Sequence, residues 1–233
     1  MGEGIAFTEQ LASSPVVETK FCLRDDRWPG ERRITYKYPA IGVADTRKCI
    51  EAIGRLRYEL FVQRDGKKYE CADHQAGIFL EPIDAVSLNF QATDHQRCLA
   101  TVRMTWAQDA LGDKHLSKAV TNSGLPEADL SITVLNSRLA LRPEMRAKLY
   151  LTEMFRTVYR SGHMNGARYC LVAARPSLSE LYIRFGFRDT HRHYVDEVGG
   201  EMAITKLDLH DGEHLRRTRS PLLDVFEELH PIS

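Results

Sequence analysis

The sequence has no net charge, because 32 lysines and arginines balance 32 aspartates and glutamates over 233 residues. No global field therefore draws nucleic acid or an acidic membrane to it, and an acidic partner must meet a local patch. No apolar run is long enough to cross a bilayer. We expect neither a membrane span nor a secretory signal.

Cysteine and histidine form no recognisable disulfide or metal pattern. The five cysteines are odd in number and lack a Cys-x-x-Cys pair, which favours reduced thiols in a cytoplasmic protein; they are Cys22, Cys49, Cys71, Cys98 and Cys170. Among nine histidines, His191 and His193 lie two residues apart, but no third ligand follows at suitable spacing. We therefore expect no metal and no permanently bound cofactor.

Three regions of the chain differ in composition and periodicity. Residues 1–33 are polar and weakly periodic, and Trp28-Pro29-Gly30-Glu31 interrupts regular structure, so an arm or lid is expected there. Residues 34–210 carry the periodicities of the main domain. Residues 211–233 are expected to be a helical tail, with one helix from Leu215 to Leu229.

Apolar patterning predicts the elements of the main domain. Short apolar or alternating runs predict strands over residues 34–38, 86–91, 97–106, 132–141, 169–174 and 202–209. Helical periods predict helices over residues 45–62, 151–161 and 178–185. Residues 64–82 are expected to be a loop, and 107–130 a connection with one short helix. This order indicates an α/β fold, an α+β layered domain with a mixed sheet. In the strand 97–106, Cys98 and Met104 are expected on one face and Arg103 on the other.

The segment from Ser137 to Phe187 carries the most functional information. A strand enters a loop, Arg142-Pro143-Glu144-Met145-Arg146-Ala147-Lys148-Leu149, and an amphipathic helix follows. A second strand leads to a predicted capping box, Ser177-Leu178-Ser179-Glu180, and to a short helix that bears Tyr182 and ends at Gly186. This segment resembles the acyl-donor half of the GNAT (Gcn5-related N-acetyltransferase) fold, whose loop amides hold a pantetheine pyrophosphate at a helix N-terminus.

The GNAT resemblance implies a mixed, mostly antiparallel sheet with a splayed strand pair, flanked by helices. It places the acyl-donor site on Leu139, Leu141, Arg142, Arg146, Ala147 and Lys148. Ala147 and Leu149 replace two glycines that would bring backbone close to phosphate, and this replacement favours acyl carrier protein over free coenzyme A as donor. The basic residues of the loop suit an acidic carrier or a pyrophosphate, and a solvated helix start is the alternative.

Four further motifs occur in a characteristic order. They are Arg57-Tyr58-Glu59-Leu60-Phe61, Glu81-Pro82-Ile83-Asp84, Arg103, and Asn136-Ser137-Arg138. Their order resembles the acyl-homoserine-lactone (autoinducer) synthases and the bacterial N-acyl amino acid synthases over residues 45–210. Leu135 stands where the lactone synthases carry an acidic base, and Lys67 where a tryptophan is expected. Both changes argue against S-adenosylmethionine as acceptor and favour the N-acyl amino acid synthases.

The resemblance implies a role for each motif. Tyr182 would protonate the leaving thiolate as a general acid, and a core tyrosine is the alternative. Arg103 and Arg138 either bind the carboxylate of the acceptor or pair with Glu81 and Asp84. Glu81 and Asp84, acting through water, are also the candidates for the base that deprotonates the acceptor amine.

Two further residues are assigned by the resemblance, and an overall activity follows. Arg57 with Phe61 is expected to order the N-terminal lid, unless it is a surface arginine beside a core phenylalanine. Backbone amides from Leu139 to Leu141 are expected to stabilise the oxyanion. The predicted activity moves a fatty acyl group from an acyl-phosphopantetheine thioester, on acyl carrier protein or coenzyme A, to the amine of an amino acid or similar small amine. The alternatives are a non-catalytic thioester-binding regulatory module and an acetyl-coenzyme A-dependent N-acetyltransferase.

Overall fold

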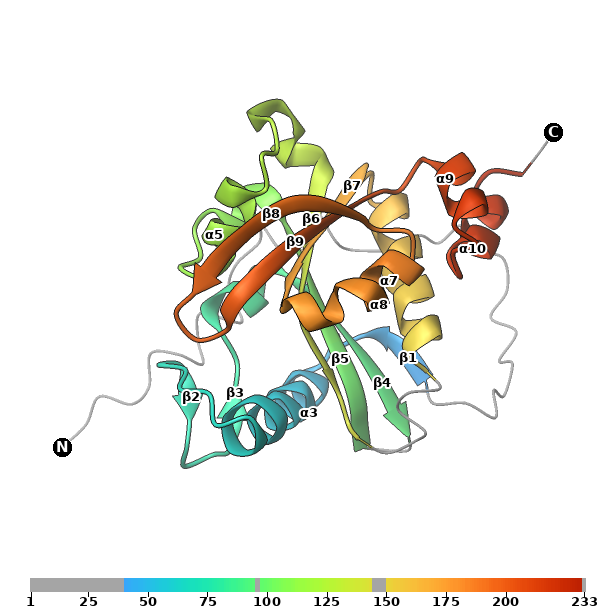
Figure 1. Ribbon diagram of the computed structural model, residues 1–233. Coiled ribbons are helices and arrows are strands. Elements are labelled where there is room, and N and C mark those ends of the chain that lie inside the picture. Colours follow the sequence, from blue (N-terminus) through green and yellow to red (C-terminus); the bar gives the residue numbers. More distant parts are fainter. Residues whose placement is uncertain (1–39, 95–96, 144–149, 232–233) are drawn as a thin grey trace.

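A seven-stranded mixed sheet forms the centre of the molecule (Figure 1). The computed structural model describes residues 40–94, 97–143 and 150–231. The strand order is β1-β4-β5-β6-β7-β9-β8, and every neighbouring pair is antiparallel except β6 and β7. The strands are β1 (Ala40–Val43), β4 (Leu88–Asp94), β5 (Arg97–Trp106), β6 (Thr133–Leu141), β7 (Tyr169–Ala174), β8 (Arg188–Asp196) and β9 (Gly200–Asp208). The predicted mixed, mostly antiparallel sheet is confirmed.

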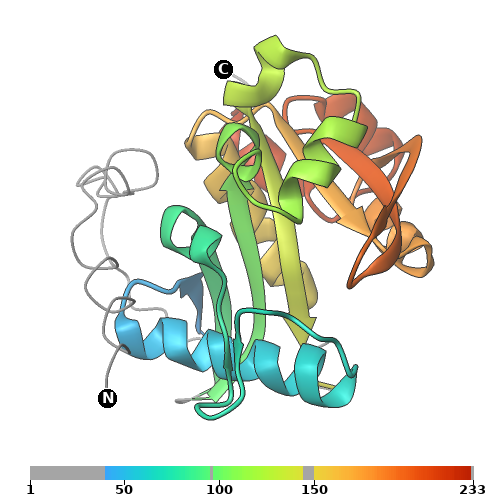
Figure 2. The same ribbon diagram turned by 90° about the vertical axis from the view of Figure 1, so that its left-hand side faces the viewer.

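Helices cover both faces of the sheet. Neighbouring residues of a strand point to opposite faces, and on β5 Val102 packs in the cluster of α7 (Leu151–Met164), whereas Arg103 points toward the side of α3 (Arg47–Arg57). Figure 2 shows α3 lying across the strands. The helix α8 (Ser179–Arg184) follows β7 and carries Tyr182 into the main core.

The remaining described elements are short. They are α4 (Ala107–Ala110), α5 (Leu116–Asn122), α9 (Gly212–Arg217), α10 (Leu223–Leu229), the strand pair β2 (Ala72–Asp73) and β3 (Ile78–Phe79), and three 3-10 turns at Pro82–Val86, Glu127–Ile132 and Pro176–Leu178. The segment expected to be a loop over residues 64–82 thus contains a small hairpin. None of the helices in the described ranges combines the length and apolar character needed to cross a membrane.

The helix expected over residues 45–62 has the right extent but changes its winding. It begins after Thr46, whose hydroxyl accepts a hydrogen bond from the Cys49 amide, and from Tyr58 to Arg64 it continues as a π-helix. A π-helical turn widens the helix and is frequent at functional sites. Phe61 lies in this widened part and packs edge-on against Phe79.

The expected face of Cys98 is wrong. The register of β4 and β5 shifts between Ala92 and Thr93, so that Leu99 is an extra residue in β5. Cys98 consequently packs with Ile53 of α3 and not with the residues of α7. An alternation rule fails across a bulge because one added residue exchanges the two faces.

Two expected helix boundaries are also wrong. The predicted capping box at Ser177 does not form, because a 3-10 turn runs directly into α8 and the residue before the helix, Leu178, makes no side-chain cap. The single terminal helix is broken into α9 and α10, since Arg219 adopts a φ of 52° and Pro221 follows it. The expected arm (residues 1–33) and the expected strand at 34–38 lie outside the described residues.

Candidate active site

The parallel strands β6 and β7 separate halfway along their length. Their pairing begins at Thr133 with Tyr169 and ends at Asn136 with Val172. Beyond this point β6 pairs only with β5, and β7 only with β9. A gap therefore opens inside the sheet, and the residues that follow in each strand face it.

A bulge in β6 lies at the mouth of this gap. On β5, Thr101 pairs with Ala140 and Arg103 pairs with Ser137, so one more residue of β6 than of β5 lies between these pairs. Arg138 adopts a φ of 54°, in the left-handed region that few residues other than glycine occupy. A bulge removes its extra residue from the ladder and re-aims neighbouring groups. Backbone groups of the bulged segment are thereby directed away from regular pairing.

A cavity of about 160 Å³ lies in the gap between the strands. One part of its wall is apolar and consists of Val102, Leu139, Phe155, Val158, Val172, Ala174, Leu178 and Tyr182. Another part carries polar or charged groups, which belong to Lys67, Tyr69, His115, Asn136, Ser137, Arg138, Arg175 and Asp196. Apolar walls with a few converging polar groups are typical of small-molecule sites.

Tyr182 lies on the apolar wall. Its ring centroid is 5.9 Å from that of Phe155 on α7 and 5.6 Å from that of Phe187, and 5% of the residue is exposed. Within the described part of the chain, its hydroxyl has no hydrogen-bond partner. Burial, with a smaller effect of Cys170, raises the pKa of the phenol well above its usual value. The phenol is therefore protonated at neutral pH and available to a bound group.

Glu81 joins two arginines at the polar wall. The Arg138 guanidinium donates to both carboxylate oxygens of Glu81, with an Nε–Oε2 distance of 2.6 Å, and Arg103 Nη1 lies 2.9 Å from Oε2. The same Arg138 guanidinium lies over the ring of Tyr69, 4.9 Å from its centroid, and 5.3 Å from that of Phe79. Burial opposes the charge of Glu81, but Arg138 and Arg103 outweigh it and lower the pKa.

Asp84 holds the other two arginine contacts of the network. Arg57 Nη1 donates to Asp84 Oδ1 over 2.8 Å, and Arg103 Nη1 lies 3.3 Å from the same oxygen. The second Asp84 oxygen accepts the Glu81 amide at 2.8 Å, and Arg57 Nη2 donates to Asn89 at 2.8 Å. Burial alone would raise the pKa of Asp84, but Arg57 and Arg103 lower it to about 2. Both acids are ionised and only weakly basic at neutral pH.

The other predicted site residues are partly gathered at the cavity. Phe61 and Leu139 line it, and the surface-arginine alternative for Arg57 is wrong because that side chain is fully buried. Leu141 is not among the lining residues. Arg142 lies in an ion pair, 2.6 Å from Glu59. The remaining donor-loop residues Arg146, Ala147 and Lys148 lie outside the described residues.

A histidine–aspartate pair at the cavity was not predicted. His115 Nδ1, at the start of α5, lies 3.1 Å from Asp196 Oδ2, at the end of β8. The amides of Val198 and Gly199 donate to the other Asp196 oxygen, which holds the carboxylate in place. Because Nδ1 faces a carboxylate, it carries the proton and leaves a lone pair on Nε2. No sequence signal links residues 81 positions apart, and β8 itself was not expected.

Comparison with solved structures identifies the fold. The structure of MesI, a CoA-dependent acyl-homoserine lactone synthase, is 14% identical with a TM-score of 0.60, covering 83% of this chain and 96% of that chain. BjaI, solved with SAM and isopentyl-CoA, is 15% identical with a TM-score of 0.58 and coverages of 77% and 80%. FeeM, an N-acyl amino acid synthase from uncultured soil microbes, is 14% identical with a TM-score of 0.51 and coverages of 74% and 96%. The fold is that of the GNAT-like acyltransferases.

The sequence comparison identifies the family. The profile of the family described as N-acyl amino acid synthase FeeM matches residues 52–205, which include the Arg57, Glu81, Arg103 and Arg138 motifs and Tyr182. The chain belongs to this family and is an acyltransferase. Among curated proteins, no sequence matches the chain significantly.

Proposed function

We propose that the protein transfers a fatty acyl group from an acyl-phosphopantetheine thioester to the amine of an amino acid. The observation that carries this proposal is the cavity between β6 and β7, with an apolar wall beside Tyr182 and a charged wall beside Arg138. The apolar wall suits an acyl chain, and the charged wall suits a small polar acceptor. A thioester carbonyl placed between them lies next to the β6 bulge.

The charged wall supports an acceptor that bears a carboxylate. Three arginines and two acids form the buried network, so its net charge is +1, although each arginine contacts an acid. Arg57 and Arg103 are fully buried and do not line the cavity, so Arg138 is the arginine of the network that a bound acceptor can reach. Burial and the positive charges of Arg175 and Arg138 lower the pKa of Lys67, which indicates a cationic environment. A carboxylate bound here would relieve that repulsion.

The reaction then needs four groups. His115 Nε2, with Nδ1 held by Asp196, takes a proton from the acceptor ammonium, and the amine attacks the thioester carbonyl carbon. Backbone N–H groups of the bulge at Leu139 stabilise the oxyanion. The C–N bond forms, the C–S bond breaks, and Tyr182 gives its proton to the departing thiolate. The attacking nitrogen then loses a second proton to the Tyr182 phenolate, which restores the phenol.

Glu81 and Asp84 have a positioning role in this proposal. Their lowered pKa values make them poor acceptors of a proton from an ammonium ion. Their contacts instead hold the three arginines in fixed orientations. For the donor we propose acyl carrier protein, because Ala147 and Leu149 stand where glycines would let the backbone approach a coenzyme A pyrophosphate.

The test is turnover of purified protein with acyl-loaded carrier protein or acyl-coenzyme A and a panel of amino acids. Thiol release and mass spectrometry of the acylated product are both followed. We expect Tyr182→Phe to lower kcat by about 10²–10⁴-fold, the usual contribution of a positioned general acid. Tyr159→Phe is the matched control, since its buried hydroxyl donates to the Leu209 carbonyl and does not line the cavity.

A second variant tests the assignment of the base. His115→Gln should lower kcat by about 10²–10⁴-fold, the usual contribution of a positioned general base, and should leave KM for the acyl donor unchanged. Thioester binding without turnover by the wild type would instead support the non-catalytic module. Preference for acetyl donors over long-chain donors would support an acetyltransferase.

A further inference from the structure

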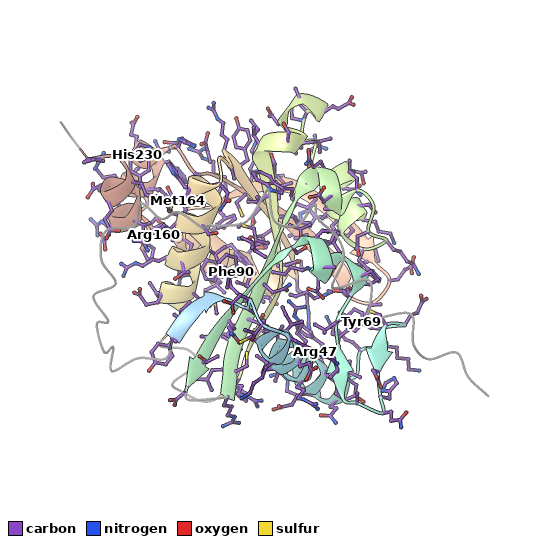
Figure 3. All side chains as sticks on the ribbon, turned by 180° about the vertical axis from the view of Figure 1, so that it is seen from behind. Arg47, Tyr69, Phe90, Arg160, Met164 and His230 are labelled. Atoms are coloured by element: carbon purple, nitrogen blue, oxygen red, sulfur yellow. The ribbon has the colours of Figure 1, made fainter. Side chains whose placement is uncertain are left out.

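Three histidines from distant parts of the chain converge at the C-terminal end of α7. His163 lies in the last turn of α7, His210 follows β9, and His230 ends α10. Their nearest ring nitrogens all lie within 4.8 Å of one another. Figure 3 shows His230 beside the end of α7 that bears Met164 and Arg160. Nothing in the proposed acyl transfer uses these side chains.

The ring nitrogens of two of these histidines lie close together. His230 Nδ1 lies 3.0 Å from the Phe226 carbonyl oxygen, so the Nδ1–H group donates a hydrogen bond to that oxygen and Nε2 retains a lone pair. That Nε2 is 3.3 Å from His163 Nε2. Two nitrogens on a tetrahedral zinc ion, each about 2.0–2.1 Å from the metal, are separated by about 3.3–3.4 Å. The observed spacing matches this value.

Ring packing holds the imidazoles of the three histidines in place. The His230 ring stacks on Phe226, with centroids 4.2 Å apart, and the His163 ring lies beside His210, with centroids 4.5 Å apart.

Neighbouring charges neither fill the site nor block it. The cations of Arg160 and Arg168 lie in ion pairs with Glu228 and Asp208. Among the described residues, no carboxylate or thiol joins the group of three imidazoles. His210 is exposed, so its ring can turn toward the other two.

We propose that His163, His210 and His230 bind one divalent transition-metal ion, with zinc as the expected ion and water as the fourth ligand. Three imidazoles and a water form a known zinc ligand set. The ion would link the end of α7 to the residue pair that follows β9 and to the end of α10. It would be a structural ion that fixes α10 against α7, the helix whose Phe155 and Val158 line the cavity. This site departs from the expectation of no metal, because sequence spacing could not reveal ligands that only the fold brings together.

The experiment uses the full chain without an affinity tag, freed of metal by a chelator and then dialysed. Calorimetric titration with zinc chloride should give one ion per chain, and zinc should raise Tm. His210→Ala should weaken zinc binding at least tenfold and abolish the Tm increase. His210 is exposed, so its loss should leave the metal-free Tm and circular dichroism unchanged.

His191→Ala is the matched control, since His191 is an exposed histidine on β8 that does not belong to the group of three, and this variant should bind zinc as the wild type does. Cobalt(II) provides a second readout, because three imidazoles and a water in tetrahedral geometry give an intense visible absorption. The proposal is overturned if the wild type shows no saturable zinc binding, or if His210→Ala binds zinc with wild-type affinity. Both results are independent of acyl transfer.

Discussion

Replacement of Asp84 by Asn tests whether the buried ion pairs hold the site together. Asp84 is 6% exposed and contacts Arg57 at 2.8 Å and Arg103 at 3.3 Å, and both guanidinium groups are fully buried. Removing one partner of a buried pair leaves an uncompensated charge and typically costs about 3–5 kcal/mol. We expect Asp84→Asn to lower the free energy of unfolding by this amount at pH 7, measured by urea denaturation.

The pH dependence provides a second measure of the same interaction. The pKa of Asp84 is lowered from 3.8 to about 2 in the folded protein. A lowered pKa contributes stability above the unfolded pKa, and this stability is lost as the pH falls through the folded pKa. Because a tenfold change in an equilibrium is about 1.4 kcal/mol, the loss between pH 4 and pH 2 is about 2 kcal/mol. The stability difference between wild type and Asp84→Asn should therefore shrink across this window.

The matched control is an exposed ion pair. Arg47 and Glu51 lie 2.9 Å apart on α3, with side chains 79% and 39% exposed, so Glu51→Gln should cost no more than about 0.5 kcal/mol. A cost for Asp84→Asn below 1 kcal/mol, or a difference from wild type that does not change between pH 4 and pH 2, would refute the reasoning.

Two further predictions concern the acceptor and the backbone. Arg138→Ala should raise KM for an amino acid about 10–100-fold, since a hydrogen bond to a charged group contributes about 1.5–3 kcal/mol, while KM for the acyl donor changes little. The decarboxylated amine of the same acid should be an equally poor substrate for both proteins; a variant that still prefers the acid would contradict this role. Gly186→Ala should destabilise the fold by about 1–3 kcal/mol in urea, because Gly186 has a φ of 93° and an added Cβ would lie 2.7 Å from Leu215. A neutral effect would contradict the strain argument.

The elements predicted correctly are those with a buried face. The strand expected over residues 97–106 and the helix after Tyr150 both appear, because their apolar side chains repeat with the period of the element. β8 was missed because it lies at the sheet edge and most of its side chains are exposed, so its apolar pattern is weak. The apolar periodicity that sequence analysis detects arises because one face of an element is buried, and an exposed strand lacks it.

The candidate site divides in the same way. The structure contains the predicted ion pairs of Arg103 and Arg138 with Glu81 and Asp84, which were one of two alternatives. They could be predicted because these residues belong to motifs that occur in a characteristic order. The roles of Tyr182 and of the donor loop stay predictions. His115 with Asp196, and the three histidines near α10, were missed because each group is assembled from elements whose packing is a property of the whole fold.

The bulge at Arg138 reverses which residues of β6 point to each face of the sheet. Before the bulge, Ser137 points toward Arg103 on the α3 side of the sheet. After the bulge, Ala140 packs on the same side. In an unbroken strand, two residues three positions apart would point to opposite faces. Leu139 is thereby turned to the α7 side, where it lines the cavity. One strand thus contacts the arginine network before the bulge and lines the cavity after it. Deleting one residue at the bulge would turn the side chains that follow to the opposite face of the sheet.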